Sequence, residues 1–501
     1  MESKMNKTII KLGLASVLII STSASTLTYS TVQTSAPSYL LENQEVKSSI
    51  QVENEFNKHL MAIEDIKTDI KTFLDENNEY VKGAFSNTGI ESLEITNIKS
   101  NYRLHEILTN LVAKSWINTL KSFRITNSKI KKTGLQALVD HLPTQLHVLN
   151  LAYNKIGTDG AIVLADTLHR LPQLQTLNLN ANYIEDDGVE ALVDNLPAQL
   201  HILDLGTNYI EDDGAIALVD HLPTQLHILN LDNNYIRADG AIALADTLHR
   251  LPQLQTLNLS ENNIETTGVV ALAGVLHRLT QLQTLNLGDN NIGDDGTIAL
   301  ARALSNSTQL QTLNLNHNNI GDAGAIALAG ALPTQLENLY LEYNKIRKKG
   351  AIALADALPA QLHILDLDNN YIRADGAIAL ADALHRAPQL QTLNLGCNNI
   401  GDTGTIALAN ALSKSTQLKI LVLNYNNIGD AGTITLADAL SKSAQLKNLY
   451  LGCNDIGDAG AVALANDLPT QLHILTLFSN NIGEIGIKAL KQRTRIQLNI
   501  R

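Results

Sequence analysis

Hydrophobic residues recur along most of the chain in the pattern LxxLxLxxNxI, whose eleven positions we number from one. The first copy begins at Leu146, and twelve more follow in register with spacings of 26 or 28 residues. Thirteen regular copies indicate a solenoid built from one repeated unit. The asparagines at position nine are Asn154, Asn182, Asn208, Asn234, Asn262, Asn290, Asn318, Asn344, Asn370, Asn398, Asn426, Asn454 and Asn480.

The two halves of each unit predict a strand followed by a helix. The leucines at positions four and six alternate with polar residues, which predicts a short strand with one buried face. The second half, such as residues 321–332, places Leu328 and Leu332 four apart, as on one face of a helix. One unit cannot bury these faces alone, so neighbouring units must stack. Because a helix is wider than a strand, the stack should bend with the strands inside.

These residues resemble leucine-rich repeats, and the second half of each unit is similar to the ribonuclease-inhibitor-like subclass. That subclass includes NOD-like receptors and Ran GTPase-activating proteins. The resemblance covers roughly residues 90–501. It implies an α/β fold: a right-handed, horseshoe-shaped leucine-rich-repeat solenoid with a parallel β-sheet on the concave face and helices on the convex face. It implies a surface for presenting residues to a partner, without specifying the partner.

The polar residues at the end of the pattern have expected structural roles. Asparagine in the bend after a strand can bond to backbone groups of its own and neighbouring turns, so we expect a ladder. Asp294 lies four residues beyond Asn290, just before the expected helix, where aspartate is a preferred cap. Gly296 is expected to allow close packing as that helix begins. Asp322, Asp402, Asp430 and Asp458 occupy equivalent places.

The N-terminus has the features of a secretory signal. Lysines precede the apolar run 12–20, and small residues follow as far as Ser25. We expect residues 1–25 to be a signal peptide cleaved near Ser25, with an uncleaved anchor as the alternative. Residues 26–50 have the composition of a flexible leader. No later apolar run is long enough to span a membrane. We therefore expect a bacterial protein that is exported to the periplasm, the cell surface or the medium.

The remainder divides into three parts. Residues 51–85 are predicted to form an amphipathic helical segment, because apolar residues from Val52 to Phe73 recur at three- and four-residue steps. Its apolar stripe either caps the array or pairs with another helix or chain. Residues 86–140 form a capping region with degenerate repeats, in which Ser128 replaces the asparagine. Residues 141–501 hold the thirteen repeats and a terminal cap strand.

Charge and loop composition exclude several kinds of site. The net charge of −13 argues against nucleic acid and anionic membranes, and it is compatible with a basic partner. The segment "LQTLNLGDNNIGDDG" (282–296) is rich in aspartate, asparagine and glycine. Counting from Asp289, however, a calcium loop would require glycine where Asp294 stands and glutamate where Leu300 stands. We expect no metal and no cofactor.

Histidine and cysteine give no catalytic constellation. His201 and His227 follow the first leucine of neighbouring strands, but such histidines occur only after the shorter linker and therefore reflect duplication. Cys397 and Cys453 lie at the same position two repeats apart, about 10 Å, which is too far for a disulfide. We expect no catalytic residue and no enzymatic activity.

Departures from the consensus identify a candidate binding surface. The second, third, fifth, seventh and eighth positions should face the groove. Position five is asparagine or aspartate in the first seven repeats and then becomes Tyr340, Asp366, Asn394, Val422, Tyr450 and Thr476. Aromatic residues surrounded by acids are typical of protein-binding hot spots. Drift on an unused surface is the alternative, and Tyr183, Tyr209 and Tyr235 form a weaker candidate. The predicted partner-binding residues are Tyr340, Glu342, Tyr343, Asp366, Asp368, Tyr425, Tyr450 and Phe478.

The sequence thus favours a non-enzymatic scaffold that binds a protein partner on its concave face, in the setting of a host-interacting secreted bacterial protein. One alternative is a self-associating structural or adhesin-like surface protein. Another is a regulator of a small GTPase, which rests on the resemblance to Ran GTPase-activating proteins. The polar residues that such a regulator needs near its early repeats are not assignable in this sequence.

Overall fold

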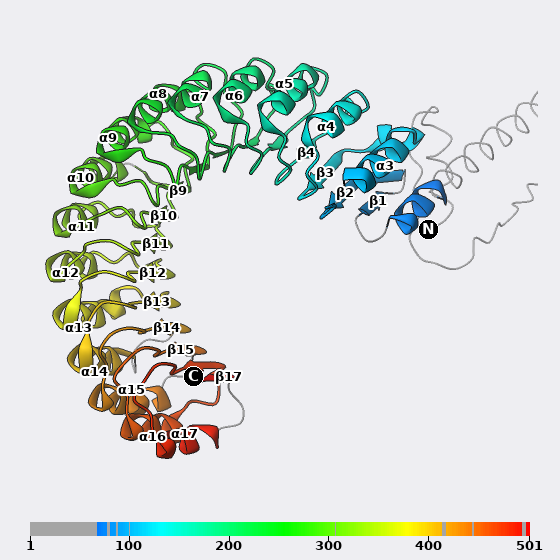
Figure 1. Ribbon diagram of the computed structural model, residues 1–501. Coiled ribbons are helices and arrows are strands. Elements are labelled where there is room, and N and C mark those ends of the chain that lie inside the picture. The colour runs from blue at the N-terminus through cyan, green and yellow to red at the C-terminus, as the bar shows by residue number, and fades with distance from the viewer. Residues whose placement is uncertain are drawn as a thin grey trace, which may run out of the picture.

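The computed structural model describes an open arch of stacked strand–helix units (Figure 1). Strands line the inner side of the arch and helices its outer side. The predicted signal peptide, leader and first part of the helical segment lie outside the described residues. The described residues are 68–77, 81–86, 89–99, 101–305, 307–412, 417–442, 445–492 and 497–500.

The strands and helices alternate regularly along the described chain. The strands are β1 (Val81–Ser86), β2 (Gly89–Thr96), β3 (Ser122–Thr126), β4 (Val148–Asn150), β5 (Thr176–Asn178), β6 (Ile202–Asp204), β7 (Ile228–Asn230), β8 (Thr256–Asn258), β9 (Thr284–Asn286), β10 (Thr312–Asn314), β11 (Asn338–Tyr340), β12 (Ile364–Asp366), β13 (Thr392–Asn394), β14 (Ile420–Val422), β15 (Asn448–Tyr450), β16 (Ile474–Thr476) and β17 (Gln497–Asn499). The helices are α3 (Asn101–Val112), α4 (Lys131–Val139), α5 (Gly157–Leu168), α6 (Glu185–Val193), α7 (Asp212–Ala217), α8 (Ala238–Leu248), α9 (Glu265–Leu276), α10 (Gly293–Leu304), α11 (Asp322–Ala329), α12 (Lys348–Asp356), α13 (Arg373–Ala383), α14 (Gly401–Leu412), α15 (Asp430–Lys442), α16 (Asp458–Asp467) and α17 (Glu484–Lys491), with 3₁₀ turns η1 (Ser115–Thr119) and η2 (Leu384–Arg386).

Each strand from β2 onward pairs in parallel with the strand of the next unit, and the register is constant. Thr284, Leu285 and Asn286 of β9, for example, lie opposite Thr312, Leu313 and Asn314 of β10. From β4 to β16 the central leucine of each triplet is buried, and in most of these triplets its two neighbours are half-buried on the concave face. The predicted leucine-rich-repeat solenoid, with strands inside and helices outside, is therefore confirmed.

The N-terminal end departs from the expected parallel array. Residues 68–76 are helical, but Val81–Ser86, inside the predicted helical segment, is strand β1, which pairs antiparallel with β2. Ile70 and Phe73 are buried in the core, and the Phe73 ring meets Trp116 edge-on at 5.5 Å. The Trp116 indole donates a 3.0 Å hydrogen bond to Asp69. An amphipathic pattern alone could not predict this hairpin, because helix and strand compete for a short apolar run.

The asparagines form the predicted ladder, which joins each repeat to both neighbours. The backbone N–H of Asn318 donates to the side-chain oxygen of Asn344 at 3.1 Å. The side-chain amide of Asn318 donates to the carbonyl of Leu287 in the preceding repeat at 2.8 Å. Asn318 is fully buried, so these bonds satisfy polar groups that water cannot reach.

The aspartate at the start of each helix caps the next repeat, which corrects the expectation that it caps its own helix. Asp294 lies inside the first turn of α10, and its Oδ1 accepts hydrogen bonds from the backbone N–H groups of Gly321 (2.7 Å) and Gly324 (2.8 Å). Both groups belong to the beginning of α11. A side chain at Gly324 would also collide with Ile320 and Asp294, which explains the glycine. The aspartates that cap the following helix are Asp186, Asp212, Asp294, Asp322, Asp402, Asp430 and Asp458.

This aspartate determines how the next helix begins. After Asp294, residue Gly321 is extended with φ −98° and helix α11 starts one residue later. After Thr266, which lacks the carboxylate, Gly293 is left-handed with φ +66° and is itself the first residue of α10. Its N–H then donates forward to the carbonyl of Asn318 at 2.8 Å. The same left-handed start follows every other repeat without the aspartate: Gly157, Glu185, Glu265, Arg373 and Gly401.

Removal of one capping aspartate should loosen one junction. Asp294→Ala leaves the N–H groups of Gly321 and Gly324 without their acceptor, so we expect faster amide exchange at both and a loss of about 1 kcal/mol. We also expect Gly321 to become left-handed, as Gly293 is. Hydrogen–deuterium exchange with NMR or mass spectrometry would detect the local change.

Asp295→Ala is the matched control, because Asp295 is exposed on the same turn. Similar exchange rates in the two variants would contradict the cross-repeat cap. The reciprocal change Thr266→Asp should protect the amides of Gly293 and Gly296.

Candidate functional site

Position eight of every repeat has a left-handed backbone, with φ between 48° and 60° across the thirteen residues. Its N–H donates to the carbonyl at position seven of the next repeat, as Tyr343 does to Asp368 at 2.9 Å and Tyr425 to Gly452 at 3.0 Å. This conformation favours glycine and asparagine, and other residues adopt it at a cost of about 1 kcal/mol or more. Tyrosine at this position is therefore not explained by the backbone.

The structure brings five predicted residues together as a tyrosine–carboxylate cluster: Tyr340, Glu342, Tyr343, Asp366 and Asp368. Tyr340 of β11 lies directly opposite Asp366 of β12. Glu342 and Asp368 occupy position seven of the same two repeats. The side chain of Tyr343 is 48% exposed, whereas the other four are half-buried. The cluster is thus a partly desolvated acidic surface with one projecting ring.

His317 is a neighbour that the sequence did not identify as part of this cluster. Its ring stacks on Tyr343 with centroids 4.2 Å apart, and its Nδ1 lies 3.5 Å from Asp289. All three residues occupy position eight of successive repeats, so adjacency along that position was the signal that could have revealed the contact. The stack holds the tyrosine ring in one orientation before any partner binds.

The acids in the cluster resist ionisation. Burial raises the pKa of Glu342, and repulsion from Asp366 and Asp368 raises it further. Burial also raises the pKa of Asp366 and of Asp368, although Asn394 and the backbone N–H of Asp368 donate hydrogen bonds to Asp366. A cationic group placed here would relieve the repulsion, which suits a basic partner.

The other three predicted residues form a separate C-terminal aromatic cluster: Tyr425, Tyr450 and Phe478. Tyr425 is 55% exposed, and Tyr450 lies between Val422 and Thr476 in the sheet. Phe478 is half-buried, because its ring covers the backbone of Gly452. Three strand spacings, about 14 Å, separate Tyr425 from Tyr343.

The cysteines beside Tyr425 are free, as their spacing predicted. Burial, with repulsion from Asp368, raises the pKa of the Cys397 thiol to about 11. A hydrogen bond with Cys453 raises the pKa of Tyr425. A thiol that stays protonated at neutral pH is a poor nucleophile and a poor metal ligand.

A second buried polar network, also missed by the sequence, lies in the early repeats. Asn178 and Asn230 donate to the two oxygens of Asp204 at 2.8 and 2.9 Å. Burial raises the pKa of Asp232 nearby. Asp204 is thus held by donors from the scaffold, as Asp366 is by Asn394 and the backbone N–H of Asp368.

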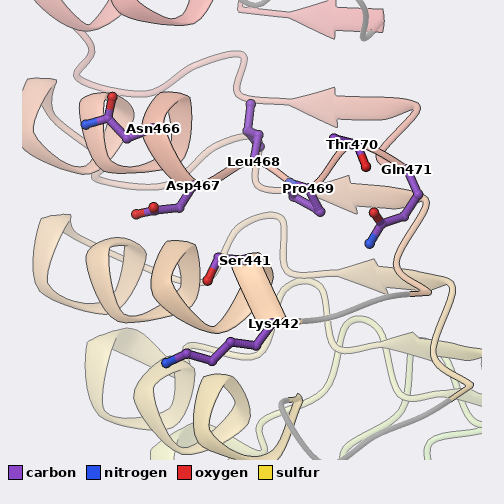
Figure 2. Close-up of a pocket in the computed structure, with 8 residues that line it drawn as sticks. All are labelled: Ser441, Lys442, Asn466, Asp467, Leu468, Pro469, Thr470 and Gln471. Carbon is purple, nitrogen blue, oxygen red and sulfur yellow. The ribbon is translucent and has the colours of Figure 1, made fainter.

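A hollow of about 360 Å³ lies at the helix ends, away from the concave face (Figure 2). Its lining comes from the C-terminal ends of α15 and α16 and the segment that follows α16. Lys442 pairs with Asp438 at 2.8 Å, and Ser441 donates to the Asp438 carbonyl. These contacts stabilise the C-terminal end of α15 and do not build a binding site in the hollow. The hollow contains none of the predicted binding residues.

Two features of the described residues bear on other kinds of site. Within them, histidine, cysteine and acidic side chains form no group of three or more that could hold a metal ion. Nor do they include a helix with the length and apolar character to cross a membrane.

Comparison with known proteins identifies the class. The chain is an open solenoid of strand–helix repeats, and nine of its segments match the family described as "Leucine Rich repeat": residues 144–165, 171–193, 199–219, 251–273, 279–301, 306–329, 388–409, 414–437 and 442–465. The chain is therefore a leucine-rich-repeat protein. Proteins of this class generally act as scaffolds for protein interaction, and the fold is typically non-catalytic.

Solved structures similar to this chain include an internalin (InlF) from Listeria monocytogenes and the Rad7–Elc1 complex from yeast. The first is 24% identical, covers 68% of this chain and 93% of its own, and has a TM-score of 0.48. The second is 15% identical, covers 92% of this chain and 99% of its own, and has a TM-score of 0.44. Comparison with curated proteins gives no match.

Replacement of Asp366 by asparagine should stabilise the scaffold at neutral pH. Because the raised pKa makes the folded chain bind this proton more tightly than the unfolded chain does, wild-type stability falls as pH rises through that pKa. Asparagine, common at position five, carries no such penalty. We expect Asp366→Asn to melt higher at pH 7 and the difference to shrink as the pH is lowered.

Thermal unfolding followed by circular dichroism across pH would measure the difference. Asp295→Asn controls for the loss of one negative charge at an exposed site. A lower melting temperature for Asp366→Asn at pH 7 would show that the carboxylate contributes bonds worth more than its burial costs.

Proposed function

We propose that this protein is a non-enzymatic scaffold that binds a protein partner through the C-terminal half of its concave face. The contact residues are those of the tyrosine–carboxylate cluster and the C-terminal aromatic cluster. We further propose that the protein is exported and acts on a host-associated partner, on the strength of the signal-like sequence at residues 1–25.

The observation that carries this proposal is the placement of Tyr343 and Tyr425. Both have left-handed backbones, where asparagine, present at the equivalent Asn233 and Asn369, would fit more easily. Both rings are about half exposed, so they gain little from burial in the scaffold. Exposed aromatic residues that stabilise neither backbone nor core are typical binding anchors.

The chemistry around Tyr343 favours a partner with apolar and basic groups. Glu342, Asp366 and Asp368 lie in repeats eight and nine, close to the ring, and repel one another. A lysine or arginine from the partner would neutralise this repulsion in a partly desolvated place, where charge–charge interactions are stronger than in water. The aromatic rings would meanwhile bury apolar surface. The acidic surface of the whole chain, with net charge −13, would steer such a partner by long-range attraction.

The double variant Tyr343→Asn/Tyr425→Asn tests the proposal. Asparagine suits the left-handed backbone, so the scaffold should keep or gain stability while losing both rings. We expect affinity for the partner to fall at least tenfold, which corresponds to about 1.4 kcal/mol. Quantitative capture of partners by immobilised wild type and variant, followed by mass spectrometry and titration of the captured protein, would measure the loss.

Tyr153→Asn is the matched control. Tyr153 also occupies position eight with φ 60° and is 61% exposed, but it belongs to the first repeat. Capture that is equal for all three proteins would refute the assigned surface. If wild type instead forms dimers in light scattering and the double variant does not, these rings mediate self-association.

A further inference from the structure

Three tyrosines form a stacked row on the loops between strand and helix, which we call the tyrosine ladder: Tyr183, Tyr209 and Tyr235. Their ring centroids are 5.1 and 5.6 Å apart in succession. The side chains are 36%, 42% and 54% exposed. Lys155, at the same position of the preceding repeat, places its ammonium 5.7 Å from the Tyr183 ring centroid. The ladder is therefore an ordered aromatic strip that already accepts one cation.

The ladder lies apart from the concave clusters. Position ten follows the buried asparagine, in the loop where each repeat leaves the sheet and turns toward its helix, so the three rings lie in succession along these loops. They belong to repeats two to four, whereas the concave clusters belong to repeats eight to thirteen.

The backbone does not account for these tyrosines. Tyr183 and Tyr209 have φ values of 60° and 64°. Asparagine occupies position ten in six other repeats and shares this conformation at Asn291 and Asn319, for example. Asparagine tolerates the left-handed region better than tyrosine does. Tyrosine at positions 183 and 209 is therefore less favourable for the backbone than asparagine would be, and what it adds is an exposed aromatic surface.

The charges beside the ladder define what it can bind. Glu185 and Asp187 follow Tyr183, while Glu211 and Asp213 follow Tyr209, and all four are exposed. They are separate from the capping carboxylates Asp186 and Asp212, whose oxygens are engaged by the next helices. The Glu185 carboxylate also accepts a 3.4 Å hydrogen bond from the Thr158 hydroxyl. The strip therefore combines aromatic rings with exposed carboxylates, with Lys155 and Arg237 beside its two ends. Such a surface attracts guanidinium and ammonium groups, which contact aromatic rings favourably and pair with acids.

We propose that the tyrosine ladder, with Glu185 and Glu211, is a docking strip for an extended, arginine- or lysine-bearing segment of another protein. An extended segment places side chains of one face about 6.6 Å apart, close to the spacing of the rings. Alternate basic side chains then reach successive rings and carboxylates, as Lys155 reaches Tyr183 at one end. This surface is independent of the proposed concave site.

The triple variant Tyr183→Asn/Tyr209→Asn/Tyr235→Asn tests the strip. The probe is a fluorescein-labelled synthetic peptide of alternating arginine and threonine, which can place all its arginines on one face when extended, followed by fluorescence anisotropy at low and physiological salt. We expect the triple variant to bind at least about tenfold more weakly than wild type. Glu185→Gln/Glu211→Gln, which leaves the rings, should weaken binding and reduce its salt dependence. A peptide with glutamate in place of arginine should not bind.

Tyr371→Asn is the matched control, because Tyr371 is a lone tyrosine at position ten and is 56% exposed. It should bind the peptide as wild type does, and so should Tyr343→Asn/Tyr425→Asn, which separates this proposal from the concave one. The proposal is overturned if wild type does not bind the arginine peptide, if the triple variant binds equally well, or if Tyr371→Asn loses as much. Sedimentation that finds dimers for wild type and monomers for the triple variant would overturn it in favour of a second copy as occupant.

Discussion

The whole array depends on one constraint: the polar groups buried between repeats need hydrogen-bond partners in neighbouring repeats as well as in their own. Asn318 illustrates it, since its amide bonds to Leu287 of the repeat before and its backbone N–H to Asn344 of the repeat after. Within the stack, loss of one partner would leave such a buried group unsatisfied at a cost of roughly 1–3 kcal/mol. Stacking is therefore enforced by hydrogen bonding as well as by burial of leucine. This rigid ladder holds the exposed positions in fixed order.

The same dependence on neighbours explains what the sequence could predict. Leucine spacing, strand, helix and asparagine ladder all follow from a pattern read within one repeat, and all were predicted. The role of Asp294 was assigned wrongly, because its carboxylate reaches Gly321 and Gly324 across the junction. Whether this carboxylate reaches the next helix depends on how far one repeat is displaced from the next in the stack, and the sequence of a single repeat does not specify that displacement. Once that displacement is known, the residue four positions after each asparagine predicts whether the backbone at the start of the next helix is extended or left-handed.

The sequence predicted which residues belong to the candidate site, but it did not predict all of their side-chain contacts. Departure from the internal consensus identified Tyr340, Tyr343 and the acids, and parallel register placed them on adjacent strands. The stack of His317 on Tyr343 depends on side-chain directions from left-handed backbone, and the burial of Phe478 depends on the space left by Gly452 in the neighbouring repeat. The pattern within one repeat does not reveal either contact. The eight residues consequently form two clusters instead of one continuous patch.

The eighth repeat differs from the other repeats in two places, on its concave face and at the start of its helix. On the concave face it supplies Tyr340, Glu342 and Tyr343. At its helix start Lys348 stands where a capping aspartate usually lies, so α13 begins left-handed at Arg373, and Lys348 instead pairs with Asp375 at 2.7 Å. Neither the concave-face residues nor Lys348 stabilises the backbone of this repeat or the packing of its core. The first repeat also combines an exposed, left-handed tyrosine, Tyr153, with a missing capping aspartate at Thr158. What distinguishes the eighth repeat is therefore the group of half-buried acids, Glu342, Asp366 and Asp368, beside its tyrosines.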